Sequence, residues 1–64
     1  MKHWEIQSET HGHVRIEWNE SATVNLQTPV GGQWVDFHCF THYGLETGYD
    51  AIKSALEVLE DLES

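Results

Sequence analysis

Five histidines and one cysteine stand in this chain of 64 residues, and both side chains are common zinc ligands. The closest groupings are the His-Gly-His run at residues 11–13 and the segment 38–42, which contains His38, Cys39 and His42. Zinc sites draw about four ligands into a tetrahedron, typically by combining Cys-x2-Cys with His-x3–5-His. A single cysteine and scattered histidines do not reproduce that combination. We therefore predict no metal and no other cofactor.

The sequence also lacks the short motifs of common catalytic sites. It contains no Gly-rich phosphate loop, no Gly-x-Ser-x-Gly elbow and no His-Glu-x-x-His zinc motif. Carboxylates such as Glu5, Glu17 and Asp36 could meet across strands, but a chain this small has little room for a pocket that excludes water. We predict that the protein is not an enzyme.

Negative charge is the most distinctive property of the chain. Three Lys and Arg residues stand against eleven Asp and Glu residues, which gives a formal net charge of −8 with histidine neutral. Binding to nucleic acid without sequence preference depends on cations that pair with phosphates, so this balance rules out most binding of that kind. An anionic membrane surface is disfavoured for the same reason.

Several carboxylates repeat at a four-residue spacing in the C-terminal segment. Glu46 precedes Asp50 by four residues, Glu57 precedes Asp61 by four, and Glu60 lies beside the second pair. Most such charge runs are solvated helix faces that keep a protein in solution. The alternative is that regularly spaced carboxylates imitate a phosphate backbone and occupy a basic groove on a nucleic-acid-binding protein.

Alternation of apolar and polar residues predicts β-strands over most of the chain. We expect four strands, at about residues 4–9, 13–18, 22–27 and 33–41. The strongest turn signal is Thr28–Gly32, because proline fixes φ and glycine permits positive φ. After Gly44 the period changes and predicts a helix from about Gly48 to about Leu62, with Thr47 as its N-cap. The predicted fold is one α+β domain over residues 1–64, a four-stranded antiparallel sheet followed by one C-terminal helix packed on one face (ββββα).

A single helix covers only one face of a sheet, so each strand is expected to have a core side and an outer side. Cys39 is in phase with Val35 and Phe37, which predicts a small buried hydrophobe. Trp34, Asp36, His38 and Phe40 have the opposite parity and are expected on the outer face, unless a bulge shifts the register and buries one of the two aromatic rings. The predicted core consists of Trp4, Ile6, Val14, Ile16, Trp18, Val24, Leu26, Val35, Phe37, Cys39, Tyr49, Ile52, Leu56 and Leu59.

The cellular compartment is predicted from what the sequence lacks. With one cysteine no disulfide can form within the chain, and small secreted domains usually rely on several. No stretch approaches the roughly 18 apolar residues of a membrane span, and the first residues lack the apolar run of a signal peptide. We expect a complete, cytoplasmic protein.

In size, acidity and compact α+β layout the chain resembles the small phage-encoded inhibitors of host defence, including anti-CRISPR proteins. The resemblance covers the whole chain at the level of class, and no residue motif carries it. It implies a non-enzymatic inhibitor or adaptor that docks on the basic surface of a partner protein. The alternative is a self-associating module, a homodimer through the aromatic sheet face. The residues predicted to bind a partner are Glu46, Asp50, Glu57, Glu60, Asp61, Trp34, Asp36 and Phe40.

Overall fold

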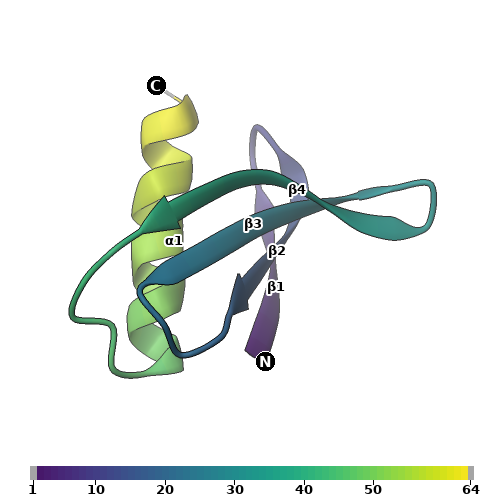
Figure 1. The fold of residues 1–64 in the computed structure, drawn as a ribbon. Helices are drawn as coiled ribbons and strands as arrows, with labels where there is room; N and C mark the ends of the chain where they lie inside the picture. The colour runs from purple at the N-terminus through teal and green to yellow at the C-terminus, as the bar shows by residue number, and fades with distance from the viewer. Residues whose placement is uncertain (1, 64) are drawn as a thin grey trace.

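Alternating residues form the sheet and residues at helical spacing form the helix, as the sequence predicts. The computed structural model describes residues 2–63. Its four strands form one antiparallel sheet in the order β1-β2-β3-β4, and the helix α1 covers one face of that sheet (Figure 1). The ββββα arrangement is confirmed. In chain order the elements are β1 (Lys2–Ser8), β2 (Gly12–Trp18), β3 (Thr23–Val30), β4 (Gln33–Thr41) and α1 (Gly48–Glu63).

The turn between β3 and β4 is narrower than predicted. Gly31 and Gly32 alone form it, with φ values of 59° and 82°, in a two-residue hairpin whose backbone twist matches that of the paired strands. Pro29 therefore lies inside β3, opposite Trp34. Proline is tolerated there because β2 pairs with β3 only as far as Gln27, which leaves one side of this stretch without a partner strand.

An extra residue in β4 determines which of its side chains face the helix. Leu26 of β3 lies opposite His38, whereas the next residue, Gln27, lies opposite Asp36. Phe37 is thus left over as a β-bulge, with no partner on β3. A bulge of one residue reverses the alternation of side chains beyond it.

The bulge overturns part of the predicted assignment of β4. Trp34 and Asp36 lie on the outer face as expected, but Phe40 lies opposite Val24 and packs against the core on the helix side. His38 also moves to the helix side, for the same reason. Cys39 lies on the outer face and is exposed, so the prediction of a buried thiol is wrong.

The core lies between the two central strands and α1. The strands contribute large apolar side chains, whereas α1 contributes mainly small ones, and Ala51 and Ala55 let the helix approach the sheet closely. Val35, which was predicted in the core, is 45% exposed because the end of the β3–β4 hairpin projects beyond α1 (Figure 1). The buried apolar residues are Val14, Ile16, Trp18, Val24, Leu26, Ala51, Ala55 and Leu59.

The helix is rotated relative to the packing that its largest side chains predict. Tyr49 and Leu56 were expected in the core, but they are 74% and 48% exposed. Gly48 lies so close to the Trp4 ring that a Cβ atom at this position would stand 2.5 Å from Trp4 Cζ2. The close approach turns the alanine side of α1 toward the sheet and leaves the tyrosine and leucine outside. No helix within residues 2–63 has the length and apolarity to cross a membrane.

Candidate functional site

The first carboxylate of α1 is held by reciprocal hydrogen bonds at the start of the helix. The Asp50 amide donates to Thr47 Oγ1 at 3.3 Å, and Asp50 Oδ2 accepts from the Thr47 amide at 3.1 Å. The same oxygen accepts from the Glu46 amide at 3.2 Å and from the Thr47 hydroxyl at 3.1 Å. This is a complete capping box, with aspartate in place of the usual glutamate. The amides of Glu46 and Thr47 lower the pKa of Asp50, so its charge already stabilises its own helix.

The remaining carboxylates of α1 are exposed on its solvent side, where Glu57 borders the end of β4 and Glu60 borders β1. Positions 50, 57 and 61 fall on one face at helical spacing, and Glu57, Glu60 and Asp61 are exposed. Lys53 lies on the same face between the first two positions, and Glu46 is exposed just before the helix. We call this surface the acidic stripe, and define it as Asp50, Glu57, Glu60 and Asp61.

Beyond Asp50, the acidic stripe lies where negative charge costs helix stability. Within the described part of α1 the last turn carries no basic residue, although the helix dipole favours cations there. Glu57 and Asp61 are four residues apart, and like charges at that spacing destabilise a helix by about 0.2–0.5 kcal/mol per pair. Asp50 stabilises the start of the helix, whereas Glu60 and Asp61 lie near its end, where the dipole disfavours negative charge, and Glu57 is repelled by Asp61.

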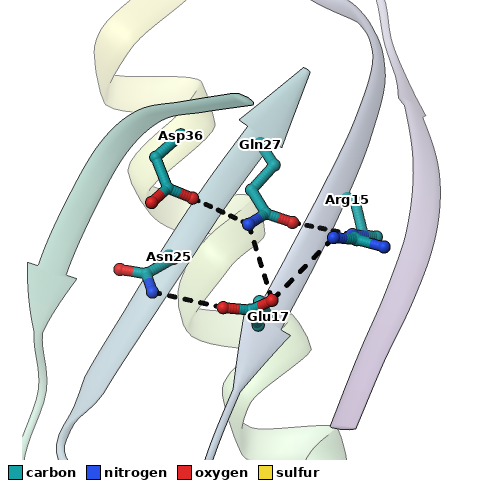
Figure 2. Close-up of polar contacts among 5 residues, drawn as sticks. All are labelled: Arg15, Glu17, Asn25, Gln27 and Asp36. Carbon is teal, nitrogen blue, oxygen red and sulfur yellow. Dashed lines mark hydrogen bonds and ion pairs between the residues drawn. The ribbon is translucent and has the colours of Figure 1, made fainter. Parts of the chain in front are cut away.

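The outer face of the sheet carries a polar network that the sequence did not predict (Figure 2). At its centre is Gln27 of β3, whose side chain is on the open face yet only 6% exposed. Gln27 Nε2 donates to Asp36 Oδ1 at 2.7 Å, and Gln27 Oε1 accepts from Arg15 Nε at 2.7 Å. Longer contacts complete the network: Glu17 accepts from Gln27 and Asn25 at 3.5 Å, and its Oε2 lies 3.9 Å from Arg15 Nη2. One amide thereby links three strands.

Trp34 closes over this network. Its ring lies over the Arg15 guanidinium, with 4.9 Å between Arg15 Cζ and the ring centroid, and it meets the His13 ring edge to face at 5.1 Å. His13 Nε2 in turn lies 2.7 Å from Glu5 Oε1. Trp34 is half-buried by these contacts, which contribute to the fold through cation–π attraction and aromatic packing. It is less available as an anchor for a partner than an isolated outer-face tryptophan.

The predicted site residues thus fall into three places. The structure brings the carboxylates of α1 together with Glu46, and it places Trp34 and Asp36 together on the opposite side of the sheet. Phe40 belongs to neither group, because it packs against the core. Sequence reasoning missed Gln27, and the signal for it was only partial: Arg15 and Gln27 have the outer-face parity, but their alignment with Asp36 depends on the bulge.

A hydroxyl–imidazole pair joins the end of the sheet to the helix. Ser54 Oγ lies 2.9 Å from His42 Nδ1, and such pairs serve as nucleophile and base in several enzyme classes. Ser54 is only 7% exposed between α1 and the sheet, and both residues line small open pockets of about 220 and 170 Å³ beside the helix. We interpret the pair as a link that holds the segment after β4 on the helix. Among residues 2–63 no three His, Cys, Asp or Glu side chains form a group that could hold a metal ion.

No protein-family model, curated protein or solved structure matches this chain. Its function is therefore inferred from its own geometry. The resemblance to phage-encoded inhibitors stays an expectation of class. The acidic stripe and the Trp34 side of the sheet are the two surfaces that hold most of the predicted binding residues.

Proposed function

We propose that this protein is a small acidic inhibitor or adaptor that binds a basic surface of another protein through its acidic stripe. The observation that carries the proposal is the placement of the carboxylates. Glu57, Glu60 and Asp61 are exposed toward the end of α1, where the helix dipole disfavours negative charge, whereas Asp50 stabilises the helix start. A cationic partner would convert this local repulsion into attraction.

The dimensions of the stripe favour a partner that normally binds nucleic acid. From Asp50 to Asp61 the helix rises about 16 Å, at 1.5 Å per residue. Over the same length one strand of duplex DNA presents about five phosphates. Lys53 is the one basic residue within this span, so the field of the stripe is predominantly negative. The net charge of −8 on the whole chain would also accelerate encounter with a basic groove, by long-range electrostatic steering.

The structure weakens the case for self-association through the aromatic sheet face, which the sequence had offered as the alternative function. That interface needed Trp34 and Phe40 side by side, and Phe40 packs on the other side of the sheet. Trp34 is already in contact with Arg15 and His13. A partner on this face would therefore meet a charged network closed by one half-buried ring, rather than an apolar patch.

The test is charge reversal on the stripe against charge reversal elsewhere. The stripe variant carries Glu57→Lys and Asp61→Lys, and the control carries Glu9→Lys and Glu20→Lys; each changes the formal charge by four, from −8 to −4. All four side chains are exposed, so folding should survive, and the surface ion pair of Glu20 with Lys2 is of a kind that contributes little to stability.

The partner is first captured from lysate of the source cell on immobilised wild-type protein, and is then titrated with both variants at two salt concentrations. We expect the stripe variant to lose at least about a hundredfold in affinity, because each reversal replaces attraction with repulsion. The control should lose much less, and wild-type affinity should fall steeply with salt. Equal affinities for the two variants would refute the acidic stripe as the binding surface.

A further inference from the structure

A second surface lies where the helix runs beside β1. There a groove of about 290 Å³ is lined by residues of both elements, among them Ile6 and Ser8 of β1 and Leu56 of α1. Leu56 therefore faces the β1 side, and Tyr49, two helical turns earlier, lies on the same side of the helix. We call this surface the β1 flank and define it as Trp4, Ile6, Tyr49, Ile52 and Leu56.

The β1 flank holds the apolar area that the helix fails to bury. Tyr49 and Leu56 are among the largest apolar side chains of α1, and they are 74% and 48% exposed. From the helix the core takes Ala51, Ala55 and Leu59 instead. A domain of this size buries only about 60% of the surface that its unfolded chain exposes, so its folding stability is marginal. Leaving large apolar side chains exposed lowers that stability further. Covering them is a direct way to gain stability.

The strand beneath this flank is an open sheet edge. Among the described residues β1 pairs only with β2, and the register runs without interruption from Lys2 opposite Trp18 to Ser8 opposite Gly12. A straight edge of this kind offers unpaired amides and carbonyls to another strand. The other edge, β4, differs because the Phe37 bulge interrupts it, and bulges are a common protection against edge pairing.

We propose that the β1 flank is the interface of a homodimer, in which β1 pairs antiparallel with β1 of a second copy and the two helices lie side by side. Antiparallel pairing of two identical strands relates the two copies by a two-fold axis. Both copies then use the same surface, and the assembly stops at a dimer. The pairing continues the sheet across both molecules. It brings Glu60 of each acidic stripe to the rim of the interface, because Glu60 lines the same groove, and it leaves the other three carboxylates of the stripe uncovered. The proposal does not depend on the proposed function.

The side chains of β1 restrict the position of the two-fold axis. Residues of β1 that point toward the helix must pair with residues of the second β1 that point the same way. This condition puts the axis at a residue, and near the middle of the strand the choices are Trp4, Glu5 and Ile6. An axis at Glu5 would set two carboxylates directly opposite each other, which is destabilising. An axis at Ile6 instead sets Ile6 against its own copy and Glu5 against Gln7, so that apolar and hydrogen-bonding pairs meet.

The axis at Ile6 also fills the groove. It brings the partner subunit's Trp4 opposite Ser8, which is one of the groove residues. Because Gly48 packs on the Trp4 ring, the partner subunit's Tyr49 arrives at the same place. A cavity of about 150 Å³ already accepts benzene, so a groove of about 290 Å³ has room for a tyrosine ring. With an axis at Trp4 only residues 2–6 of the two strands would pair. The groove, which lies beside residues 6–9, would then remain unfilled.

The expected dimer is weak and reversible. The flank is about 24 Å long, from the sixteen residues of α1, and the molecule is 16 Å thin in its shortest dimension. Two such faces bury roughly 800 Å², which is below the range of stable specific interfaces and typical of weak, transient ones. Each copy carries a charge of −8, so added salt should strengthen the dimer by screening the repulsion. This is opposite to the salt dependence expected for the acidic stripe.

The experiment is sedimentation equilibrium of the full chain from about 10 µM to about 1 mM, a range that covers weak interfaces. We expect the mass to rise from 7.4 kDa toward twice that value, and to rise further at higher salt. Tyr49→Asp should weaken association by at least about tenfold, since it puts a charge into the groove. Tyr43→Asp is the matched control, because Tyr43 is also exposed but lies in the segment after β4, and it should leave association unchanged.

Amide hydrogen exchange of the wild-type protein tests the strand pairing without any substitution. Protection of β1 amides should increase with protein concentration, whereas protection of β4 amides should not. A wild-type monomer at about 1 mM would overturn the proposal and leave the flank to a different protein. Association that survives Tyr49→Asp, or concentration-dependent protection of β4, would show that the interface is elsewhere.

Discussion

The Gln27 side chain offers a direct test of the outer-face network. Gln27→Leu keeps a side chain of similar size but removes both 2.7 Å hydrogen bonds, one from Arg15 Nε and one to Asp36. Hydrogen bonds to charged groups contribute about 1.5–3 kcal/mol each. Asp36 is exposed, so water can replace part of that bond, and the Arg15 side chain is itself 20% exposed. We therefore expect a loss of about 2 kcal/mol in the free energy of unfolding, rather than the full sum.

The assay is thermal unfolding followed by circular dichroism. For a domain of this size, 2 kcal/mol corresponds to a fall in Tm of about 8–16 °C. The near-ultraviolet signal should also change, because Trp34 rests on the Arg15 guanidinium that Gln27 orients. Asn25→Leu is the control, since Asn25 makes only a 3.5 Å contact in the same network, and it should lower Tm by no more than about 4 °C. Equal shifts for the two variants would refute the central role of Gln27.

Three further predictions concern the helix start and the bulge. Gly48→Ala should lower Tm despite the better helix propensity of alanine, because the new Cβ would stand 2.5 Å from Trp4 Cζ2; a raised Tm would contradict this packing. The pKa of Asp50 is lowered in the folded protein, so its stabilisation is present at neutral pH and is lost as the pH falls below about 4. Amide exchange in the first turn of α1 should become faster as that stabilisation is lost. In the Asp50→Asn variant this acceleration at low pH should be absent. Cys39 should react with a thiol reagent in the folded protein, and a thiol that reacts only after denaturation would contradict its place on the outer face.

Local patterns predicted the elements, because each element depends on neighbouring residues. The capping box at Thr47 and Asp50 and the glycine turn at 31–32 are examples, although Pro29 made that turn seem wider than it is. The carboxylates of the acidic stripe were also predictable, since helical spacing alone places Glu57 and Asp61 on one face.

What the sequence could not reveal depends on contacts between distant residues. Both parities of β4 carry large apolar side chains, so the alternation through Phe37 looks continuous and gives no sign of a bulge. The position of Phe40, and the alignment of Gln27 with Asp36, follow from that bulge. In α1 the hydrophobic pattern favours Tyr49 as a core residue, but the close approach of Gly48 to Trp4 decides the rotation.

The sequential order of the strands has a consequence for how the chain folds. Every strand pairs with its neighbour along the chain, so each turn closes a short loop and no strand has to be inserted between two others. Closing short loops costs little entropy, and proteins dominated by such local contacts fold faster than those with distant pairings. The sheet can therefore be complete before α1 docks on it. We expect folding that is rapid for a protein made mostly of strands, with little time for the open edge of β1 to pair with other unfolded chains.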